Sequence, residues 1–171
     1  MAQEMLTTML CSSSYAVSDD FIDYIGKPAR SGSDPLLYGM GALYRLYQAE
    51  EGWVFLACPQ LGEWTDLCRA IAALTHGQLD LSQDSRFLTA EDRRRNDTKL
   101  AETLAGVFAA RPSQEWERLL KDYDVACAEV AQCHPSQFAV SDPILLDNEF
   151  LVEVEHPVFG KHPRLAPLSR L

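Results

Sequence analysis

The sequence has little positive charge. It contains 15 lysines and arginines against 25 aspartates and glutamates, which gives its 171 residues a formal net charge of −10. This balance argues against nucleic acid and against an anionic membrane surface as partners, because both attract basic proteins. An anionic cofactor is compatible with it, since such a ligand needs only a local basic pocket.

Long apolar runs are also lacking. No stretch reaches the roughly 20 apolar residues that a membrane-spanning helix needs. The first ten residues carry Glu4 and no basic residue, so they do not form a typical signal peptide. The five cysteines are an odd number, and several fall on apolar faces of predicted elements. We therefore expect reduced thiols, no disulfide framework and a cytoplasmic location.

Motifs of the common catalytic centres are missing as well. There is no glycine-rich phosphate loop that opens a helix, no G-x-S-x-G, no H-E-x-x-H and no C-x-x-C. Cys127, Cys133 and His134 are potential metal ligands, but their spacing matches no standard zinc site, so we expect no bound metal. Three consecutive arginines at 93–95 favour a solvated helix face over an anchor for a phosphate or a carboxylate.

The strongest pattern that is present predicts a β-hairpin at residues 42–58. Its first arm is rich in aromatic and apolar residues, and its second arm, 53–58, is apolar on both faces. Glu50, Glu51 and Gly52 between the arms suit a tight turn whose last position has a positive φ. Further short strands are expected at 125–130 and 150–156.

Amphipathic helices account for much of the remaining chain. Apolar residues recur at helical spacing in 3–16, 63–74, 90–111 and 113–120. Thr89 with Asp92 predicts a capping box, Gly77 a C-cap and Ser113 an N-cap. Two short helices are expected to start at 134–135 and 142–143, and the proline-containing tail 157–171 is expected to be extended. The predicted fold class is α+β: a small antiparallel sheet packed by several amphipathic helices.

Several segments resemble one known family in the same order. They are Y-R-L-Y at 44–47 with G-W-V-F-L-A at 52–57, W-T-D-L at 64–67, D-S-R-F at 84–87, Arg94 with Asn96 and Leu100, W-E-R-L-L at 116–120, D-V-A-C-A-E-V at 124–130, H-P-V-F-G at 156–160 and R-L-A-P at 164–167. Together they resemble the class III CoA-transferases, the family of formyl-CoA transferase, carnitine-CoA transferase and α-methylacyl-CoA racemase. The resemblance covers nearly all of residues 3–171.

This resemblance implies one part of a two-domain enzyme. In the family, a large domain of parallel strands and helices holds CoA and the catalytic aspartate, a small α+β domain is inserted into it, and two subunits interlock. We therefore expect a helix from the end of the large domain at 1–24, a linker at 25–41, the small domain at 42–140 and a segment returning to the large domain at 141–171. No residue of this chain matches the catalytic aspartate, so we expect no catalytic residue and no activity of the chain alone.

The resemblance also implies substrate-binding residues and partners. Gly39, Met40 and Gly41 match the position of a glycine-rich lid in the formyl-CoA transferase branch, and Gln60 matches a wall position where racemases carry glutamate. The implied substrate of the full-length enzyme is a coenzyme A thioester, with no cofactor bound by this chain. The implied partner is a second copy or a missing N-terminal half. A fragment of an acyl-CoA α-racemase and a non-catalytic module that docks with a separate catalytic half remain as alternatives.

Overall fold

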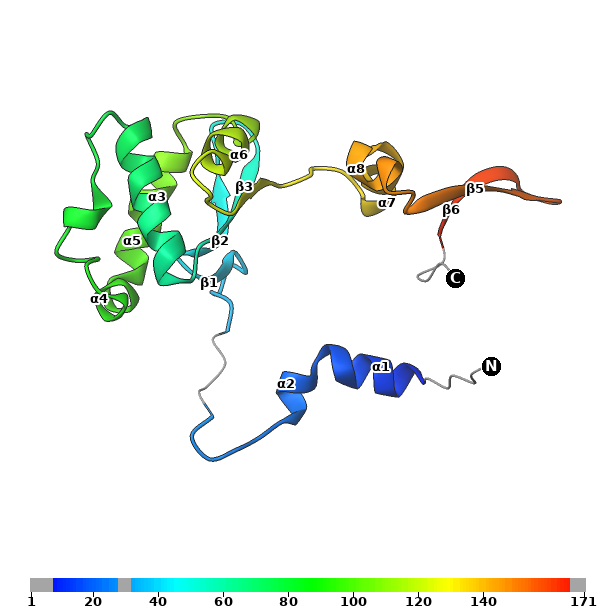
Figure 1. Ribbon diagram of the computed structural model, residues 1–171, viewed down its shortest axis with the longest axis horizontal. Helices are drawn as coiled ribbons and strands as arrows, with labels where there is room; N and C mark the ends of the chain where they lie inside the picture. Colours follow the sequence, from blue (N-terminus) through cyan, green and yellow to red (C-terminus); the bar gives the residue numbers. More distant parts are fainter. Residues whose placement is uncertain (1–7, 28–31, 167–171) are drawn as a thin grey trace, which may run out of the picture. The chain divides into compact units, whose positions relative to one another are not determined.

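The computed structural model describes residues 8–27 and 32–166 and confirms the α+β class (Figure 1). The chain divides into two compact units, Met1–Gly32 and Ser33–Leu171. In the first unit, α1 (Met9–Ala16) and α2 (Ser18–Phe21) are short helices, and the Thr8 hydroxyl caps α1 by accepting from the N–H of Cys11 at 3.2 Å. The helix predicted at 3–16 is confirmed from Met9 onward, whereas 3–7 lie outside the described residues.

The predicted hairpin consists of β2 (Tyr44–Gln48) and β3 (Trp53–Ala57). Their antiparallel register sets Tyr44 opposite Ala57, and Gly52 in the turn has the expected positive φ of 80°. Strand β1 (Gly39–Gly41) pairs with β2, and β4 (Cys127–Glu129) pairs with β3, which makes a four-stranded antiparallel sheet in the order β1-β2-β3-β4. Part of the expected linker, Gly39–Gly41, is therefore an edge strand of the sheet.

Helices cover one face of this sheet. Helix α5 (Asp97–Phe108) contacts β1 and β2, and α6 (Ser113–Lys121) contacts β3 and β4. Tyr47, Val54 and Leu56 are buried on this face. Because side chains alternate along a strand, the intervening residues point to the opposite side. We call that side the open face; it carries the half-buried or exposed side chains of Tyr44, Leu46, Trp53 and Phe55.

The core lies between the covered face and the helices, which also include α3 (Leu61–Leu74), the 3₁₀ turn η1 (Leu81–Gln83) and α4 (Ala90–Arg95). Three aromatic rings form its centre: Tyr47 stacks on Phe108 at 4.9 Å between centroids, and Phe108 meets Trp116 edge-on at 5.2 Å. Such pairs add to the free energy gained by removing apolar surface from water. The other large, fully buried side chains are Phe87, Leu56, Leu67, Ile71, Leu81, Leu100, Leu104, Leu120 and Val54.

The helix ends follow the predictions with two corrections. Thr89 and Asp92 form the expected capping box of α4. After α3, however, His76 takes the first left-handed position (φ 52°), and Gly77 follows it with φ 76° and donates its N–H to the Ala72 carbonyl at 2.7 Å. Ser113 is the first residue of α6 and not its cap, because its buried hydroxyl is engaged elsewhere and donates to the Glu129 carboxylate at 2.9 Å.

The arginine run does not form a uniformly solvated face. Arg93 is buried: its guanidinium donates to the carbonyls of Phe87 at 2.9 Å and Leu88 at 3.3 Å and lies 4.7 Å above the Trp64 ring. Arg95 is exposed and pairs with Glu91 within the same helix. The expectation of a solvated face was wrong for Arg93, because consecutive side chains point in different directions around a helix and that of Arg93 points into the protein interior.

The C-terminal part contains α7 (Pro135–Ser141), α8 (Pro143–Asp147) and a two-stranded sheet of β5 (Leu151–His156) and β6 (Gly160–Leu165). Both helices start at the predicted prolines, and β5 matches the strand predicted there. Within the predicted tail, residues 157–166 are not simply extended, because Gly160 adopts a φ of 66° and β6 folds back along β5, whereas 167–171 lie outside the described residues. Pro163 is tolerated in β6 because a strand at a sheet edge does not need every N–H.

Candidate functional site

The expected lid residues lie in an edge strand whose glycines have packing roles. A Cβ on Gly39 would collide with the Cβ of Arg45 and the carbonyl oxygen of Tyr44, so only glycine permits this approach of β1 to β2. A Cβ on Gly41 would lie 3.2 Å from Oδ1 of Asp97, the atom that accepts the N–H of Ala42 at 2.8 Å. Met40 between them is 52% exposed.

Asp34 organises the loop that leads into this strand. Its carboxylate accepts the N–H groups of Leu36 at 2.8 Å, Tyr38 at 3.4 Å and Gly39 at 3.1 Å. Its own N–H donates to the Gly39 carbonyl at 2.7 Å. Partial removal from water raises the pKa of Asp34, but the N–H donors and Arg45 outweigh this effect and hold the pKa below its ordinary value. The carboxylate thus fixes the backbone before Met40.

Arg45 is the one basic residue in strands β1 to β4. It lies opposite the buried Leu56 in the strand register, and its side chain is 18% exposed. The guanidinium lies 5.4 Å from the Tyr38 ring and 5.6 Å from the Tyr47 ring, with an Nη2 to Asp34 Oδ2 distance of 3.6 Å. Its Nε is buried without an acceptor among the described residues.

The open face carries paired aromatic rings, and Gln60, the fourth predicted site residue, follows the hairpin in the chain. Tyr44 is 37% exposed and meets Phe55 edge-on at 5.0 Å, and Trp53 lies 5.6 Å from the Tyr38 ring. Gln60 is placed at the start of α3, where it forms a capping box with Glu63 and donates its backbone N–H to that carboxylate at 2.8 Å. Gln60 therefore has a structural task in the helix, which the sequence analysis did not anticipate.

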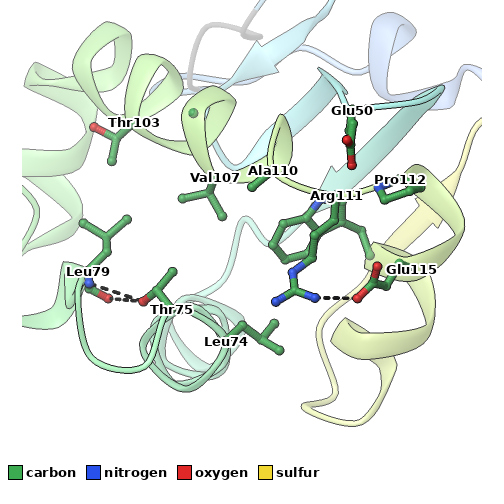
Figure 2. Close-up of a pocket in the computed structure, with 12 residues that line it drawn as sticks. Glu50, Leu74, Thr75, Leu79, Thr103, Val107, Ala110, Arg111, Pro112 and Glu115 are labelled. Carbon is green, nitrogen blue, oxygen red and sulfur yellow. Dashed lines mark hydrogen bonds and ion pairs between the residues drawn. The ribbon is translucent and has the colours of Figure 1, made fainter.

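A hollow of about 520 Å³ lies elsewhere, where the ends of α3 and α5 meet the start of α6 (Figure 2). Arg111 extends across it and pairs with Glu115, and the Thr75 hydroxyl bonds the backbone of Leu79. None of the four predicted site residues lines this hollow, and neither does any cysteine, serine or histidine. Its lining is mixed: Thr75, Thr103 and Glu50 lie among the apolar residues, beside the Arg111–Glu115 ion pair.

The cysteines and histidines do not form a reactive centre. Burial raises the pKa of Cys58, Cys68 and Cys127 to about 12 each, so these groups are protonated thiols near neutral pH. Within residues 8–27 and 32–166, no three His, Cys, Asp or Glu side chains are placed to hold a metal ion. His134 instead accepts the N–H of Ser136 at the start of α7. In the same ranges, no helix has both the length and the apolar character to cross a bilayer.

Sequence reasoning missed the role of Asp34. The signal was present, because an aspartate directly before Pro35 and a few residues ahead of a glycine is typical of a side chain that accepts nearby backbone N–H groups. The partnership with Arg45 gave no such signal, since it depends on how β1 pairs with β2.

Comparison with known proteins gives a family and a fold. The CoA-transferase family III model matches residues 2–171. Similar solved structures include Rv3272 from Mycobacterium tuberculosis (TM-score 0.63, 17% identity, 95% of this chain and 39% of that chain) and a CAIB/BAIF family protein from Brucella suis (TM-score 0.59, 18% identity, 95% and 37%). A point mutant of Rv3272 matches with 22% identity over 75% of this chain and 33% of its own, at a TM-score of 0.58.

At these identities the structural matches concern the fold alone, and the chain spans less than two fifths of the length of each of these proteins. No curated protein matches the chain. The family model, in contrast, matches almost every residue, from the end regions through the hairpin and its helices. The chain belongs to CoA-transferase family III.

Proposed function

We propose that the chain works as the small-domain portion of a CoA-transferase that acts on acyl-CoA thioesters, together with a large domain that supplies the catalytic carboxylate. The observation that carries the proposal is the lack of any buried side chain in four helices at the two ends of the described chain, α1, α2, α7 and α8. Helices in water are stabilised mainly by packing of an apolar face, so these four need a further folded surface.

The exposed apolar residues support the same proposal. Most of the large apolar side chains that are exposed belong to the two end segments: Met9, Leu10, Tyr15, Val17, Phe21, Ile22, Tyr24 and Ile25, and then Phe138, Val140, Ile144, Leu146, Phe150, Val158, Phe159 and Leu165. Surface of this kind marks interaction sites. We infer that it packs on the large domain, either within one subunit or across an interlocked homodimer.

The proposed chemistry is covalent catalysis by a carboxylate. The carboxylate attacks the thioester carbonyl and CoA leaves as the thiolate, which gives an acyl-aspartyl anhydride. The thiolate then attacks the aspartyl carbonyl, so that the donor acyl group leaves as a carboxylate and an enzyme–CoA thioester remains. The acceptor carboxylate attacks this thioester to form a second anhydride, and the thiolate attacks its acceptor carbonyl, which releases the new acyl-CoA and the free carboxylate of the enzyme. The chain's own groups do not favour this role. Its buried thiols are protonated, and Asp34, Asp84 and Asp92 are held by N–H, hydroxyl or guanidinium donors. We therefore expect no turnover by the chain alone.

In this proposal β1 forms part of the wall beside the acyl group. Met40 provides the exposed side chain, Gly39 and Gly41 allow the strand to approach β2 and α5, and Gln60 holds the start of α3 near the end of β3. The five free cysteines are consistent with a reducing compartment such as the cytoplasm.

The test compares the transfer of CoA from an acyl-CoA to a carboxylate acceptor by the purified chain and by the chain joined to the large-domain segment of a family member. The isolated chain should show no transfer, and the joined protein should show activity that disappears when the aspartate of the large domain is replaced by alanine. Turnover by the isolated chain would contradict the proposal. A strictly monomeric chain that does not associate with the large domain would contradict the packing of its ends.

A further inference from the structure

The β5–β6 hairpin has two outer edges, and the phase of its hydrogen bonds decides which backbone groups each edge carries. The N–H of Ala166 donates to the Phe150 carbonyl at 2.9 Å, and these two residues lie one step beyond the Leu151–Leu165 pair of the register. In an antiparallel pair, opposite residues alternate between those that exchange hydrogen bonds and those whose N–H and C=O groups point away from the partner strand. The even-numbered residues of β5 and β6 therefore bond across the hairpin, and the odd-numbered residues point their backbone groups outward.

Pro163 closes the outer edge of β6, whereas the outer edge of β5 keeps its donors. Pro163 is an odd-numbered residue opposite Glu153, so the N–H that proline lacks would have pointed away from β5. A proline at such a position blocks pairing at a sheet edge. The outward N–H groups of β5 belong to Leu151, Glu153 and Glu155, and in the part of the chain that the structure describes none of them donates to another segment.

The hairpin has little support besides its own ladder. Its two strands contact each other, and no other element within residues 8–27 and 32–166 makes a comparable contact with them. An isolated two-stranded hairpin is marginally stable in water, and a third strand adds to its stability. The outer edge of β5 is therefore the place where an added strand would extend this sheet.

The two faces of β5 define the side chains that an added strand needs. Val152 and Val154 are half-buried on one face, and Glu153 and Glu155 are exposed on the other. Lys161 is the cation that β6 contributes to the acidic face: it lies opposite Glu155, and its Nζ is 3.5 Å from Oε1 of Glu153. One ammonium group thus serves two carboxylates. A strand with alternating apolar and basic residues would cover the valines and supply the missing positive charge.

The strands of a second copy of this chain fit the β5 edge poorly. Two β5 strands side by side would bring Glu153 and Glu155 of one copy beside those of the other, and like charges on neighbouring strands are destabilising. The edge of β6 is closed by Pro163. Strands β1 and β4 are only three residues long, and in β4 the outward N–H of Glu129 already donates to the Glu117 carboxylate at 3.0 Å. These observations favour a basic strand from a different protein over self-association.

We propose that the outer edge of β5 binds an extended strand of a partner protein in which basic residues alternate with apolar ones. Backbone hydrogen bonds to Leu151, Glu153 and Glu155 supply the affinity, and the alternating side chains supply the specificity. The inference does not rest on the proposed function, because it follows from the ladder and the charges of the hairpin alone.

The experiment titrates the full ¹⁵N-labelled chain with the blocked peptide T-K-V-K-V-K-T. The peptide T-V-K-K-K-V-T has the same composition and charge without the alternation, and T-E-V-E-V-E-T reverses the charge. The alternating peptide should shift the amide signals of Leu151, Glu153 and Glu155 and slow their hydrogen exchange. The other two peptides should bind at least about tenfold more weakly. The scrambled peptide is the essential control, because the acidic chain attracts any basic peptide to some degree.

Two substitutions at one position separate the backbone donor from the charge. Glu153→Pro removes an outward N–H and spares the ladder, as Pro163 does on the opposite strand. Glu153→Thr removes the same charge and keeps the N–H. The proline variant should bind the alternating peptide at least about tenfold more weakly than the threonine variant. Glu102→Gln is the matched charge control, because Glu102 is exposed on α5 and pairs only with Lys99, and it should leave the affinity unchanged.

A second measurement leaves the protein unaltered. A peptide that carries N-methyl groups on alternate residues loses the donors of one edge and keeps those of the other. Of the two possible methylation patterns of T-K-V-K-V-K-T, one should bind like the parent peptide and the other at least about tenfold more weakly. In Glu153→Pro, the amide signals of Val154 and His162, which are paired across the ladder, show whether the hairpin is intact.

Three results would overturn the inference. Equal affinities of the alternating and scrambled peptides, or of the two methylated peptides, would reduce the interaction to attraction by net charge. Shifts that leave Leu151, Glu153 and Glu155 unaffected would place the peptide elsewhere on the chain. Slow exchange of these three amides without any peptide would show that the edge is already paired, by a second copy if the protection disappears on dilution and by the same chain if it persists.

Discussion

Gly52 in the β2–β3 turn lies against Ser113 at the start of α6. A Cβ on Gly52 would come within 2.6 Å of the Ser113 Oγ, and the two segments are joined by a 2.9 Å hydrogen bond from the Ser113 N–H to the Glu51 carbonyl. A second bond runs from the Glu50 N–H to the Arg111 carbonyl at 3.0 Å. The tip of the hairpin is thereby fixed to the junction between α5 and α6, which sets how the sheet meets its helices.

We predict that Gly52→Ala destabilises the fold more than a positive φ alone explains. Gly77 is the matched control, because its φ of 76° is close to the 80° of Gly52 and a Cβ there would meet nothing within 4 Å. Gly77→Ala should lower the free energy of unfolding by about 1 kcal/mol, and Gly52→Ala by about 2–4 kcal/mol. Urea denaturation measures both. Equal losses in the two variants would show that Ser113 yields without strain.

Replacement of Arg93 should be far more damaging than replacement of its neighbour. Arg93→Met removes the donor that serves the carbonyls of Phe87 and Leu88, and we expect the free energy of unfolding to fall by about 2–3 kcal/mol. Arg94→Met, at an exposed position of the same helix, should change it by less than about 0.5 kcal/mol. Thermal and chemical denaturation of both variants provide the check, and similar stabilities would contradict the buried role of Arg93.

The pH dependence of stability should include a contribution from Asp34. Its pKa is lowered in the folded protein, so the folded state favours the carboxylate, and the stabilisation is present above the pKa of the unfolded chain. It is lost as the pH falls toward the folded pKa. Urea midpoints should therefore decline below about pH 4 less steeply in Asp34→Asn than in the unmodified chain. Parallel pH profiles would indicate that Asp34 does not contribute.

Thiol reactivity should divide the cysteines into two classes. Cys11 and Cys133 are exposed, whereas Cys58, Cys68 and Cys127 have pKa values raised to about 12 by burial. At pH 8 an aromatic disulfide reagent should modify two thiols quickly and the other three at least about 100-fold more slowly. A variant with serine at both exposed positions should lack the fast phase, and all five thiols of the original chain should react quickly in guanidinium chloride. A third fast thiol in the folded chain would contradict the burial.

Local patterns explain why much of the fold could be predicted. The hairpin at 42–58, the helix after it and the Thr89–Asp92 capping box depend on residues close in sequence, and the structure confirms them. Family membership followed from short segments whose order is itself a sequence property. For the candidate site, the sequence pointed to 39–41 and Gln60 but could not separate packing residues from exposed ones.

The sequence by itself determined the class of fold and the family, because alternation, helical spacing and capping residues act over a few positions. Only the tertiary structure decided that Arg93 is buried, that Gly39 is needed for contact with Arg45 and that Met40 remains exposed. Each of these depends on which distant segment lies alongside. That choice follows from the packing of the whole core, and no local pattern encodes it.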